Sequence, residues 1–248
     1  TSGGLASPYV WDAANGLVSI EGGAPISLSA THMTGDGQFV VGTYLDFQMP
    51  GSDLQLFRWS QASGLETFPL PSGAAAVSLA GGSANGSNLK RPLLIMHAPG
   101  DTIVGQSQPP SSSAAGTAFR LKSGQPVDDL GIAPGHSYST AFRVDDSGDV
   151  VMGASFTSGG SRWEGFVWTA ASGRRALGGV PGASSASSLR PLLDVRGAPP
   201  LSASGEHLVG VAADGISHDR MIDVSWDLTA SDAAEVGVRR GPAVPNST

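Results

Sequence analysis

The sequence predicts an all-β fold of repeated antiparallel hairpins, and three observations carry this prediction. Glycine and proline are abundant, with 35 and 17 among 248 residues, and both interrupt helices and mark turns. Only 14% of the residues are charged, and no apolar run approaches the roughly 20 residues that span a bilayer as a helix. Short apolar runs instead alternate with polar turns at a period near fifty residues, which indicates a repeat architecture.

The first repeated element is a hairpin with a short polar turn between two apolar runs. Four segments align without gaps when each is anchored on its last glycine: THMTGDGQFVVG (31–42), LIMHAPGDTIVG (94–105), FRVDDSGDVVMG (142–153) and PLSASGEHLVG (200–210). A second glycine is aligned within the turn of each copy: Gly37, Gly100, Gly148 and Gly205. Because glycine takes positive φ without steric cost, we expect tight turns at these positions.

A second hairpin follows each first hairpin after roughly a dozen residues. Its copies are LFRWSQASGLETFPL (56–70), AFRLKSGQPVDDLG (118–131), GFVWTAASGRRALGG (165–179) and DVSWDLTASDAAEVG (223–237), and a fifth copy, YVWDAANGLVSIEGG (9–23), opens the chain without a first hairpin. One register of this element always holds a bulky side chain: Trp11, Trp59, Leu121, Trp168 or Trp226. Two hairpins per repeat make a unit of four strands, A to D.

Units of four strands that cannot cover both of their own faces pack around an axis, so we predict a β-propeller in one domain, residues 1–248. The repeat units are 9–23 (partial), 24–72, 73–134, 135–182 and 183–238. The prediction is five blades of about four antiparallel strands in a ring closed across the termini, with the C-terminal GVRRGPAVPNST supplying an inner strand. Four blades with an appended hairpin are the alternative.

These segments also resemble a known repeat. AFRVDDSGDVVMGAS followed by GFVWTAASGRRALGG is similar to the HAF-type extracellular repeat, with a consensus of approximately "SxAxxVSxDGxVVVGxS…AFxWTxxxGMxDLGxLGG". The resemblance covers nearly the whole chain, is closest at 139–180, and is loosest at 74–100 and 189–215. It implies a bacterial, propeller-like protein that is secreted or exposed at the cell surface, and it transfers no catalytic residue.

Charge and composition exclude several function classes. The net charge is −7 and the 14 Lys and Arg residues are scattered, so the basic stripe needed for nucleic acid is missing and we expect no nucleic-acid partner. The chain has no cysteine, which excludes disulfides and thiolate metal sites. Its first residues, TSGGLASPYV, lack the regions of a signal peptide, so we expect a processed form without a membrane span. The oligomeric state is not predicted.

The turn VDDSGDV raises the question of a bound ion. Asp145, Asp146 and Asp149 are hard oxygen donors, so calcium is one interpretation. The equivalent turns TGDGQ, HAPGD and SASGE share the glycine but lack the carboxylates, which favours a structural turn. The five histidines have no HxH or HxxxH spacing, and we predict neither a metal site nor a cofactor.

In a propeller the B-to-C and D-to-A connections gather on one face around the channel, where ligands usually bind. We expect a ligand site there from aromatic, charged and imidazole side chains of these connections: Tyr44, Asp46, Phe47, Arg91, His136, Tyr138, Arg162, Trp163, Glu164, Arg190, His218 and Asp219. Trp163 and Phe47 could instead cover the blade tops. Arg91 in KRPLL and Arg190 in LRPLL could form an anion clamp, or extend into solvent before buried strands.

The function that these residues favour is an extracellular binding module for a glycan or another surface polymer, because sugars stack on aromatic rings and hydrogen bond to charged groups. One alternative is a polysaccharide hydrolase or lyase, using carboxylates from several blades: Asp46, Glu164, Asp194 and Asp219. GxSxG, HExxH and phosphate-loop motifs are absent, so the sequence leaves catalysis undecided. A structural surface or matrix repeat is the second alternative.

Overall fold

The structure is a computed structural model, and its described part is entirely β. It describes residues 8–20, 26–34, 36–46, 55–68, 76–78, 95–96, 101–108, 116–158, 163–177, 189–191, 204, 206–213, 221–227 and 236–239. These residues form antiparallel sheets, and no helix occurs among them. Accordingly, none of the residues described belongs to a helix that could cross a membrane. The prediction of an all-β fold is confirmed.

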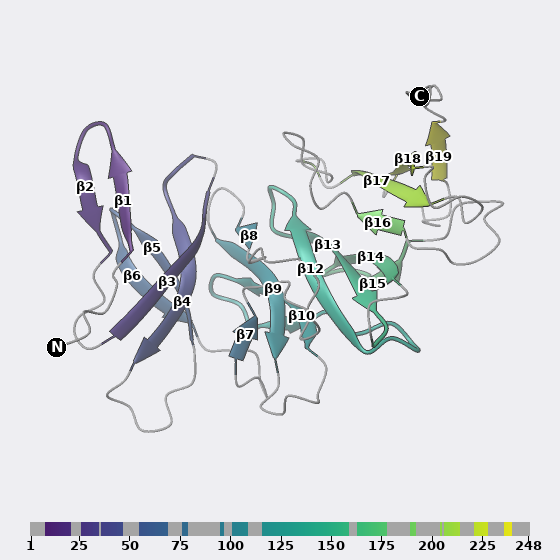
Figure 1. Ribbon diagram of the computed structural model, residues 1–248, viewed down its shortest axis with the longest axis horizontal. Helices are drawn as coiled ribbons and strands as arrows, with labels where there is room; N and C mark the ends of the chain where they lie inside the picture. The colour runs from purple at the N-terminus through teal and green to yellow at the C-terminus, as the bar shows by residue number, and fades with distance from the viewer. Residues whose placement is uncertain are drawn as a thin grey trace, which may run out of the picture. The chain divides into compact units, whose positions relative to one another are not determined.

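The chain divides into two compact units, residues 1–131 with 140–142 and residues 132–139 with 143–248. The first unit holds a two-stranded hairpin, a four-stranded sheet and a five-stranded sheet (Figure 1). Their strands are β1 (Tyr9–Asp12), β2 (Gly16–Ser19), β3 (Ile26–Met33), β4 (Val40–Asp46), β5 (Gln55–Ser60), β6 (Gly64–Phe68), β7 (Ala76–Ser78), β8 (Ile95–Met96), β9 (Thr102–Gln108), β10 (Thr117–Lys122) and β11 (Asp128–Asp129).

Two further four-stranded sheets follow, β12–β15 and β16–β19. Their strands are β12 (Tyr138–Val144), β13 (Val150–Phe156), β14 (Trp163–Thr169), β15 (Gly173–Ala176), β16 (Leu189–Pro191), β17 (His207–Ala213), β18 (Met221–Asp227) and β19 (Val236–Arg239). In both sheets, as in β3–β6, the strands lie side by side in chain order. Each therefore has the A-B-C-D meander that the two repeated hairpins predict.

The structure adds one strand to the last sheet and corrects one strand assignment. Strand β16 pairs with β17 through Leu189↔Ala212 and Pro191↔Gly210, and it lies before the segment 200–205 in which the inner strand was expected. Of that segment the structure describes Ser204 alone. Residues 237–239 of the C-terminal segment belong to β19, the D strand of that sheet, because Asp223 pairs with Arg239. They do not supply an inner strand for another blade. The rest of the C-terminal segment lies outside the described residues.

The A-to-B turns are held by a buried polar side chain at one aligned position. Asp145 is 3% exposed, and its Oδ1 accepts hydrogen bonds from the amides of Asp149 (2.9 Å) and Val150 (2.8 Å). In the first copy Thr34 takes this place, and its Oγ1 accepts from the amide of Phe39 at 3.0 Å. The turn glycines Gly37 and Gly148 have positive φ, as the sequence predicts.

The C-to-D turns are also capped from one aligned position, directly after the tryptophan. Ser60 Oγ accepts a hydrogen bond from the amide of Ser63 at 2.9 Å, and Thr169 Oγ1 accepts from the amide of Ser172 at 3.0 Å. Asp12 Oδ1 does the same for the amide of Asn15 at 2.7 Å. Each side chain satisfies a donor within the turn, which explains why short polar residues recur there.

The bulky residues of the second hairpin occupy equivalent places, as predicted. Trp11, Trp59 and Trp168 each pair with the residue six positions later on the next strand, and Trp226 pairs with Val236. We call the face of each sheet that carries this register its tryptophan face. Trp59 and Trp168 are each 8% exposed and Leu121 is 5% exposed. Burial at this register is therefore common to the three sheets of four or five strands in which this side chain is described.

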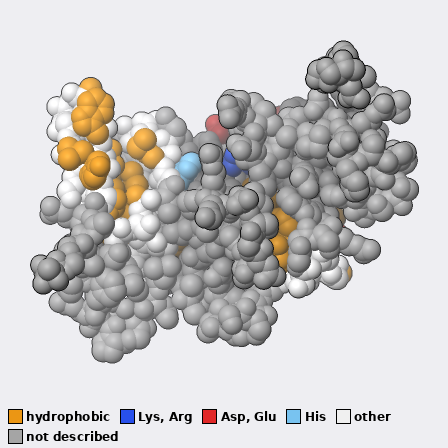
Figure 2. Space-filling model, viewed as in Figure 1, with side chains coloured by type: hydrophobic (Ala, Val, Ile, Leu, Met, Phe, Trp, Pro, Cys, Tyr) orange, Lys and Arg blue, Asp and Glu red, His pale blue; other side chains and the backbone are white. Residues whose placement is uncertain are grey.

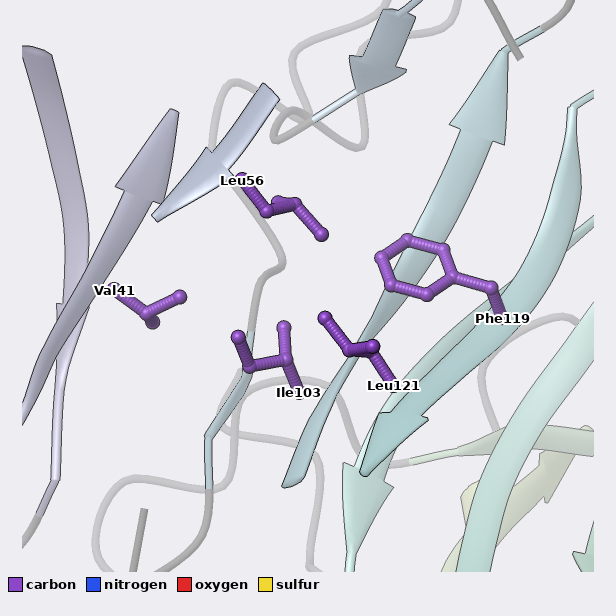
Figure 3. Packing of buried hydrophobic residues seen from close by; sticks show 5 residues of the cluster. All are labelled: Val41, Leu56, Ile103, Phe119 and Leu121. Carbon is purple, nitrogen blue, oxygen red and sulfur yellow. The ribbon is translucent and has the colours of Figure 1, made fainter. Parts of the chain in front are cut away.

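In the first unit, the tryptophan face of one sheet packs against the opposite face of the sheet before it. Val41 and Leu56 of β3–β6 point toward Ile103, Phe119 and Leu121 of the next sheet, and all five are buried (Figure 3). The preceding hairpin covers β3–β6 in the same way. Its buried Ile20, with half-buried Val10 and Val18, lies in one cluster with Leu28, Val40, Phe57 and Trp59. Apolar burial of this kind is the main stabilising contribution between such sheets.

Candidate ligand-binding site

The structure describes seven of the twelve predicted site residues. The others lie outside the described residues: Phe47, Arg91, Arg162, His218 and Asp219. Six of the seven described residues stand in strands, although we expected them in connections: Tyr44, Asp46, Tyr138, Trp163, Glu164 and Arg190. The strands are longer than predicted: backbone pairing extends to residues such as Asp46, which is the Cα partner of Ile26. Arg190 lies in β16 and pairs with Val211 of β17, so its backbone belongs to a strand and not to a connection.

One sheet end brings several predicted residues together. Tyr138 begins β12, Phe156 ends β13 and Trp163 begins β14, where it is the Cα partner of Phe156. The rings of Tyr138 and Phe156 are stacked, with centroids 4.9 Å apart and planes 11° from parallel. The amide of Ser137 donates to the carbonyl of Phe156 at 2.7 Å and holds the start of β12 against β13. The D-to-A and B-to-C connections of this sheet therefore do meet at one end.

The stacked pair is partly shielded from water. Phe156 is 8% exposed and Tyr138 is half-buried. Burial raises the pKa of the Tyr138 phenol, because desolvation disfavours the phenolate. Tyr138 therefore keeps its hydroxyl proton at neutral pH and can act as a hydrogen-bond donor and acceptor.

His136 lies in a tight turn just before this end. Its amide donates to the carbonyl of Ala133 at 3.0 Å, and its Nδ1 lies 3.2 Å from the carbonyl oxygen of Pro134. The turn is tied to the sheet because the amide of Ala133 donates to Ser155 Oγ at 3.0 Å. Gly135 within the turn has φ +76°, a conformation that favours glycine. His136 thus precedes Tyr138 by two residues along the chain, in a turn that is fixed to the sheet.

A charged group lies on the other face of the same strand end. Arg174 Nη2 donates to Ser155 Oγ at 2.9 Å and lies 3.7 Å from Glu164 Oε1. Its guanidinium stands 4.0 Å from the centroid of Phe166. Burial lowers the pKa of Arg174, and the nearby Glu164 carboxylate opposes that shift. The side chain of Glu164 is 33% exposed, so it is positioned by the arginine and remains accessible to solvent.

The Tyr138–Phe156 pair and the Glu164–Arg174 pair do not lie on the same face of the sheet. Ser155 is the Cα partner of Glu164, and Phe156 is the next residue along β13. Successive residues of a strand point to opposite faces, so Glu164 and the Tyr138–Phe156 pair flank the strand end from two sides. A ligand that touches both must lie across the end of the sheet.

Arg174 and Phe156 were not predicted as site residues. The other four hairpins hold aliphatic residues at the position equivalent to Arg174: Leu17, Leu65, Val127 and Val236. A charged residue at an otherwise aliphatic register was a usable signal in the sequence. Phe156 gave no comparable signal.

The turn VDDSGDV has a structural role in the described residues. Both carboxylate oxygens of Asp145 accept hydrogen bonds from within the turn, Oδ2 from the Ser147 hydroxyl at 2.6 Å. Asp146 and Asp149 are exposed. The part of the chain that the structure describes contains no group of three or more acidic or imidazole side chains that could hold a metal ion. These hydrogen bonds give Asp145 a structural role in the turn, and calcium binding remains a hypothesis.

Among the candidate carboxylates for hydrolysis, Glu164 is the one whose side chain is described. Asp46 ends β4 and only its backbone is described, and Asp194 and Asp219 lie outside the described residues. The ion-pair partner of Glu164 is a cation, Arg174. A two-carboxylate site would need a second acid at about 5 to 10 Å from Glu164.

Comparison with known proteins gives structural matches without a sequence match. No protein-family model and no curated protein matches the sequence. A prolyl endopeptidase aligns with TM-score 0.56 and 10% identity over 94% of this chain and 32% of that chain. A chain described as a dipeptidyl aminopeptidase IV from Bacteroides ovatus ATCC 8483 aligns with TM-score 0.50 and 12% identity, over 90% and 31%. An oligogalacturonate lyase in complex with manganese has TM-score 0.44, 13% identity and coverage of 82% and 51%.

The two peptidase matches are the ones with TM-scores of 0.50 or above. Identities of 10% and 12% show a likeness of fold alone. The chain spans about a third of the length of these peptidases. The comparisons therefore show a likeness to all-β folds, while the propeller arrangement and the resemblance to the HAF-type repeat remain predictions.

Proposed function

We propose that this chain is a binding module for an extracellular glycan or a similar surface polymer, and that the ligand lies across the end of sheet β12–β15. The observation that carries the proposal is the stacked Tyr138–Phe156 pair at a strand end that also presents His136 and, from the other side, Glu164. Sugars offer C–H surfaces that pack on aromatic rings and hydroxyls that bond to charged and imidazole groups. The site contains an aromatic pair (Tyr138 and Phe156), a carboxylate (Glu164) and an imidazole (His136).

Rigidity favours recognition at this position. The start of β12 is bonded to the end of β13, and the turn of His136 is bonded to Ser155. Glu164 is held by Arg174, which itself is fixed by Ser155 and the ring of Phe166. Side chains that are already ordered lose little conformational entropy on binding, which improves affinity for a weakly binding polymer.

We propose further that the sheets are propeller blades with the hairpin β1–β2 in the place of a fifth blade, and that the protein is a bacterial extracellular one. Packing of Ile20, Val10 and Val18 on the tryptophan face of β3–β6 supports this place for the hairpin, because the next sheet is covered in the same manner. The extracellular assignment rests on the resemblance of 139–180 to the HAF-type repeat.

A glycan array with purified protein tests the proposal. We expect binding to a defined glycan class, weakened about 2- to 10-fold by Tyr138→Ala because one aromatic contact is lost, and weakened also by Trp163→Ala. Tyr9→Ala is the matched control, since it removes a tyrosine that is 66% exposed on another sheet. Tyr138→Phe keeps the ring and should retain most of the binding. Glycan binding that is equal in all four variants would refute this site.

A further inference from the structure

Two features of the described residues differ from the equivalent places in the other repeats. Apolar side chains are exposed on hairpin β1–β2 (Figure 2), where Tyr9 and Trp11 are 66% and 68% exposed, but nothing in the described residues shows what covers them. The second feature is Ser155 of β13, which is 0% exposed. Its Oγ accepts hydrogen bonds from the amide of Ala133 at 3.0 Å and from Arg174 Nη2 at 2.9 Å. A hydroxyl has two acceptor positions, so both are filled here.

These contacts form a continuous polar chain from His136 to Glu164. The amide of His136 donates to the carbonyl of Ala133 at 3.0 Å, and the amide of Ala133 donates to Ser155. Arg174 then links Ser155 to Glu164, which lies 3.7 Å from the guanidinium. All five residues belong to the second unit. The chain therefore connects the turn before β12 with the ion pair on the tryptophan face of the same sheet.

The middle of this chain is shielded from water. Ala133 is 3% exposed and the side chain of Arg174 is 17% exposed. A buried amide that loses its acceptor is costly, so the turn and the guanidinium both depend on the position of one oxygen atom. Hydrogen bonds that share a group in such surroundings also polarise one another. A displacement on one side of Ser155 is thus transmitted to the other side.

The aligned serine of the neighbouring sheet makes a different contact. The positions equivalent to Ser155 hold Tyr44, Ser107 and Ala212. Ser107 is 6% exposed, and its Oγ donates to the carbonyl of Thr117 at 3.2 Å and lies 2.9 Å from the Thr117 hydroxyl. These two contacts stay within strands β9 and β10. Ser107 is therefore a buried serine of the same register whose hydrogen bonds do not connect a turn with an ion pair.

We propose that Ser155 is a positioning residue that couples the His136 turn to the Arg174–Glu164 pair, so that the two sides of the strand end become ordered together. The coupling is a property of the fold, whereas its effect on binding rests on the glycan function proposed above. A ligand that holds Glu164 also reduces the motion of the His136 turn through Ser155, so its second contact costs less conformational entropy. Such coupling is reciprocal, which suits a ligand that lies across the end of the sheet.

Amide hydrogen exchange, measured by NMR on the whole chain, tests the coupling without a ligand. We expect Ser155→Ala to speed exchange of the Ala133 and His136 amides about 5- to 10-fold, because the turn loses its bond to the buried hydroxyl. Arg174→Met leaves that hydroxyl in place and should still speed exchange of the Ala133 amide at least about 2-fold. The effect of Arg174→Met should vanish in the Ser155→Ala background, because the link is already removed.

Two controls separate positioning from general stabilisation. Ser107→Ala removes the aligned buried hydroxyl from another sheet and should leave exchange of the Ala133 amide unchanged. The amide of Asp145 donates to the carbonyl of Val150 at 2.9 Å, at the far end of the β12–β13 hairpin. It should exchange at the wild-type rate in Ser155→Ala, since a positioning role acts at the strand end alone.

Three results would overturn the proposal. The first is an unchanged exchange rate of the Ala133 amide in Arg174→Met. The second is an equal effect of Arg174→Met with and without the Ser155 hydroxyl, which means that the two groups act independently. The third is a rise in exchange of the Asp145 amide as large as that of Ala133, which means that Ser155 only stabilises the sheet. If Ser155→Ala does not fold, Ser155→Cys replaces it, because a thiol is a weak acceptor of similar shape.

Failure of the coupling and failure of the proposed function are distinguishable. A wild-type protein that binds no glycan refutes the glycan function and leaves these exchange rates, and hence the coupling, as they are. A glycan that binds while Arg174→Met leaves the Ala133 amide unchanged refutes the coupling and retains the function.

Discussion

Replacing Asp145 by alanine removes the side chain that organises the turn between β12 and β13. Asp145 is 3% exposed and accepts hydrogen bonds from the amides of Asp149 and Val150 and from the Ser147 hydroxyl. Hydrogen bonds to a charged acceptor contribute about 1.5 to 3 kcal/mol each. Because Ser147 and Asp149 are exposed, the Ser147 hydroxyl and the Asp149 amide can form hydrogen bonds with water once the carboxylate is removed. One fully lost bond and two partly replaced ones give a loss of about 3 kcal/mol.

For a chain of this size, about 3 kcal/mol corresponds to a fall in melting temperature of about 6 to 12 °C, measured by circular dichroism. Asp145→Thr should lose less, because Thr34 fills the same place in the first copy and accepts from the Phe39 amide. Asp146→Ala is the control within the same turn and should change stability by less than about 0.5 kcal/mol. The reasoning is wrong if Asp145→Ala melts like the wild type, or if calcium raises the melting temperature of the wild type but not of Asp145→Ala.

Three further predictions concern buried and ionisable groups. Arg120→Ala should destabilise by about 3 kcal/mol in thermal unfolding, because Arg120 is 1% exposed and pairs with Asp128 at 2.6 Å; equal stability would mean the pair contributes nothing. Trp59→Ala should cost about 3 to 5 kcal/mol while Trp11→Ala costs little in the monomer, and equal losses would contradict the burial difference. Burial raises the pKa of Tyr138 in the folded state, so its contribution to folding stability is present below the ordinary tyrosine pKa and is lost as pH rises through the pKa of the folded state. An absorbance titration should show one tyrosine that ionises at higher pH than the others, and Tyr138→Phe should remove this transition.

The repeat itself was predictable because each copy has the same turn residues and the same alternation of apolar and polar residues. The turns are marked by glycines with positive φ, such as Gly16, Gly64 and Gly173, and by a polar residue directly after the tryptophan. Both features act within the turn and do not depend on how the sheets pack. Alternation of apolar and polar residues marks the strands. These signals act over a few residues, and so the four-strand meander follows from sequence alone.

The candidate site was predictable only in part. Tyr138 and Glu164 were expected at one end of a sheet, and they are found at the ends of β12 and β14 that meet there. Their separation onto two faces depends on strand register, which a shift of one residue would reverse. The partners Phe156 and Arg174 come from strands β13 and β15, and their contacts depend on how the strands pair.

The amino-acid sequence by itself determined the β class, the turn positions and the register of the tryptophans, since these depend on backbone sterics and on the period of apolar residues. Only the tertiary structure decided which apolar faces are covered. Trp11 and Trp59 have the same local sequence signal, yet one is 68% and the other 8% exposed. Burial depends on whether another sheet packs against the face, which is a property of distant segments and of partner chains.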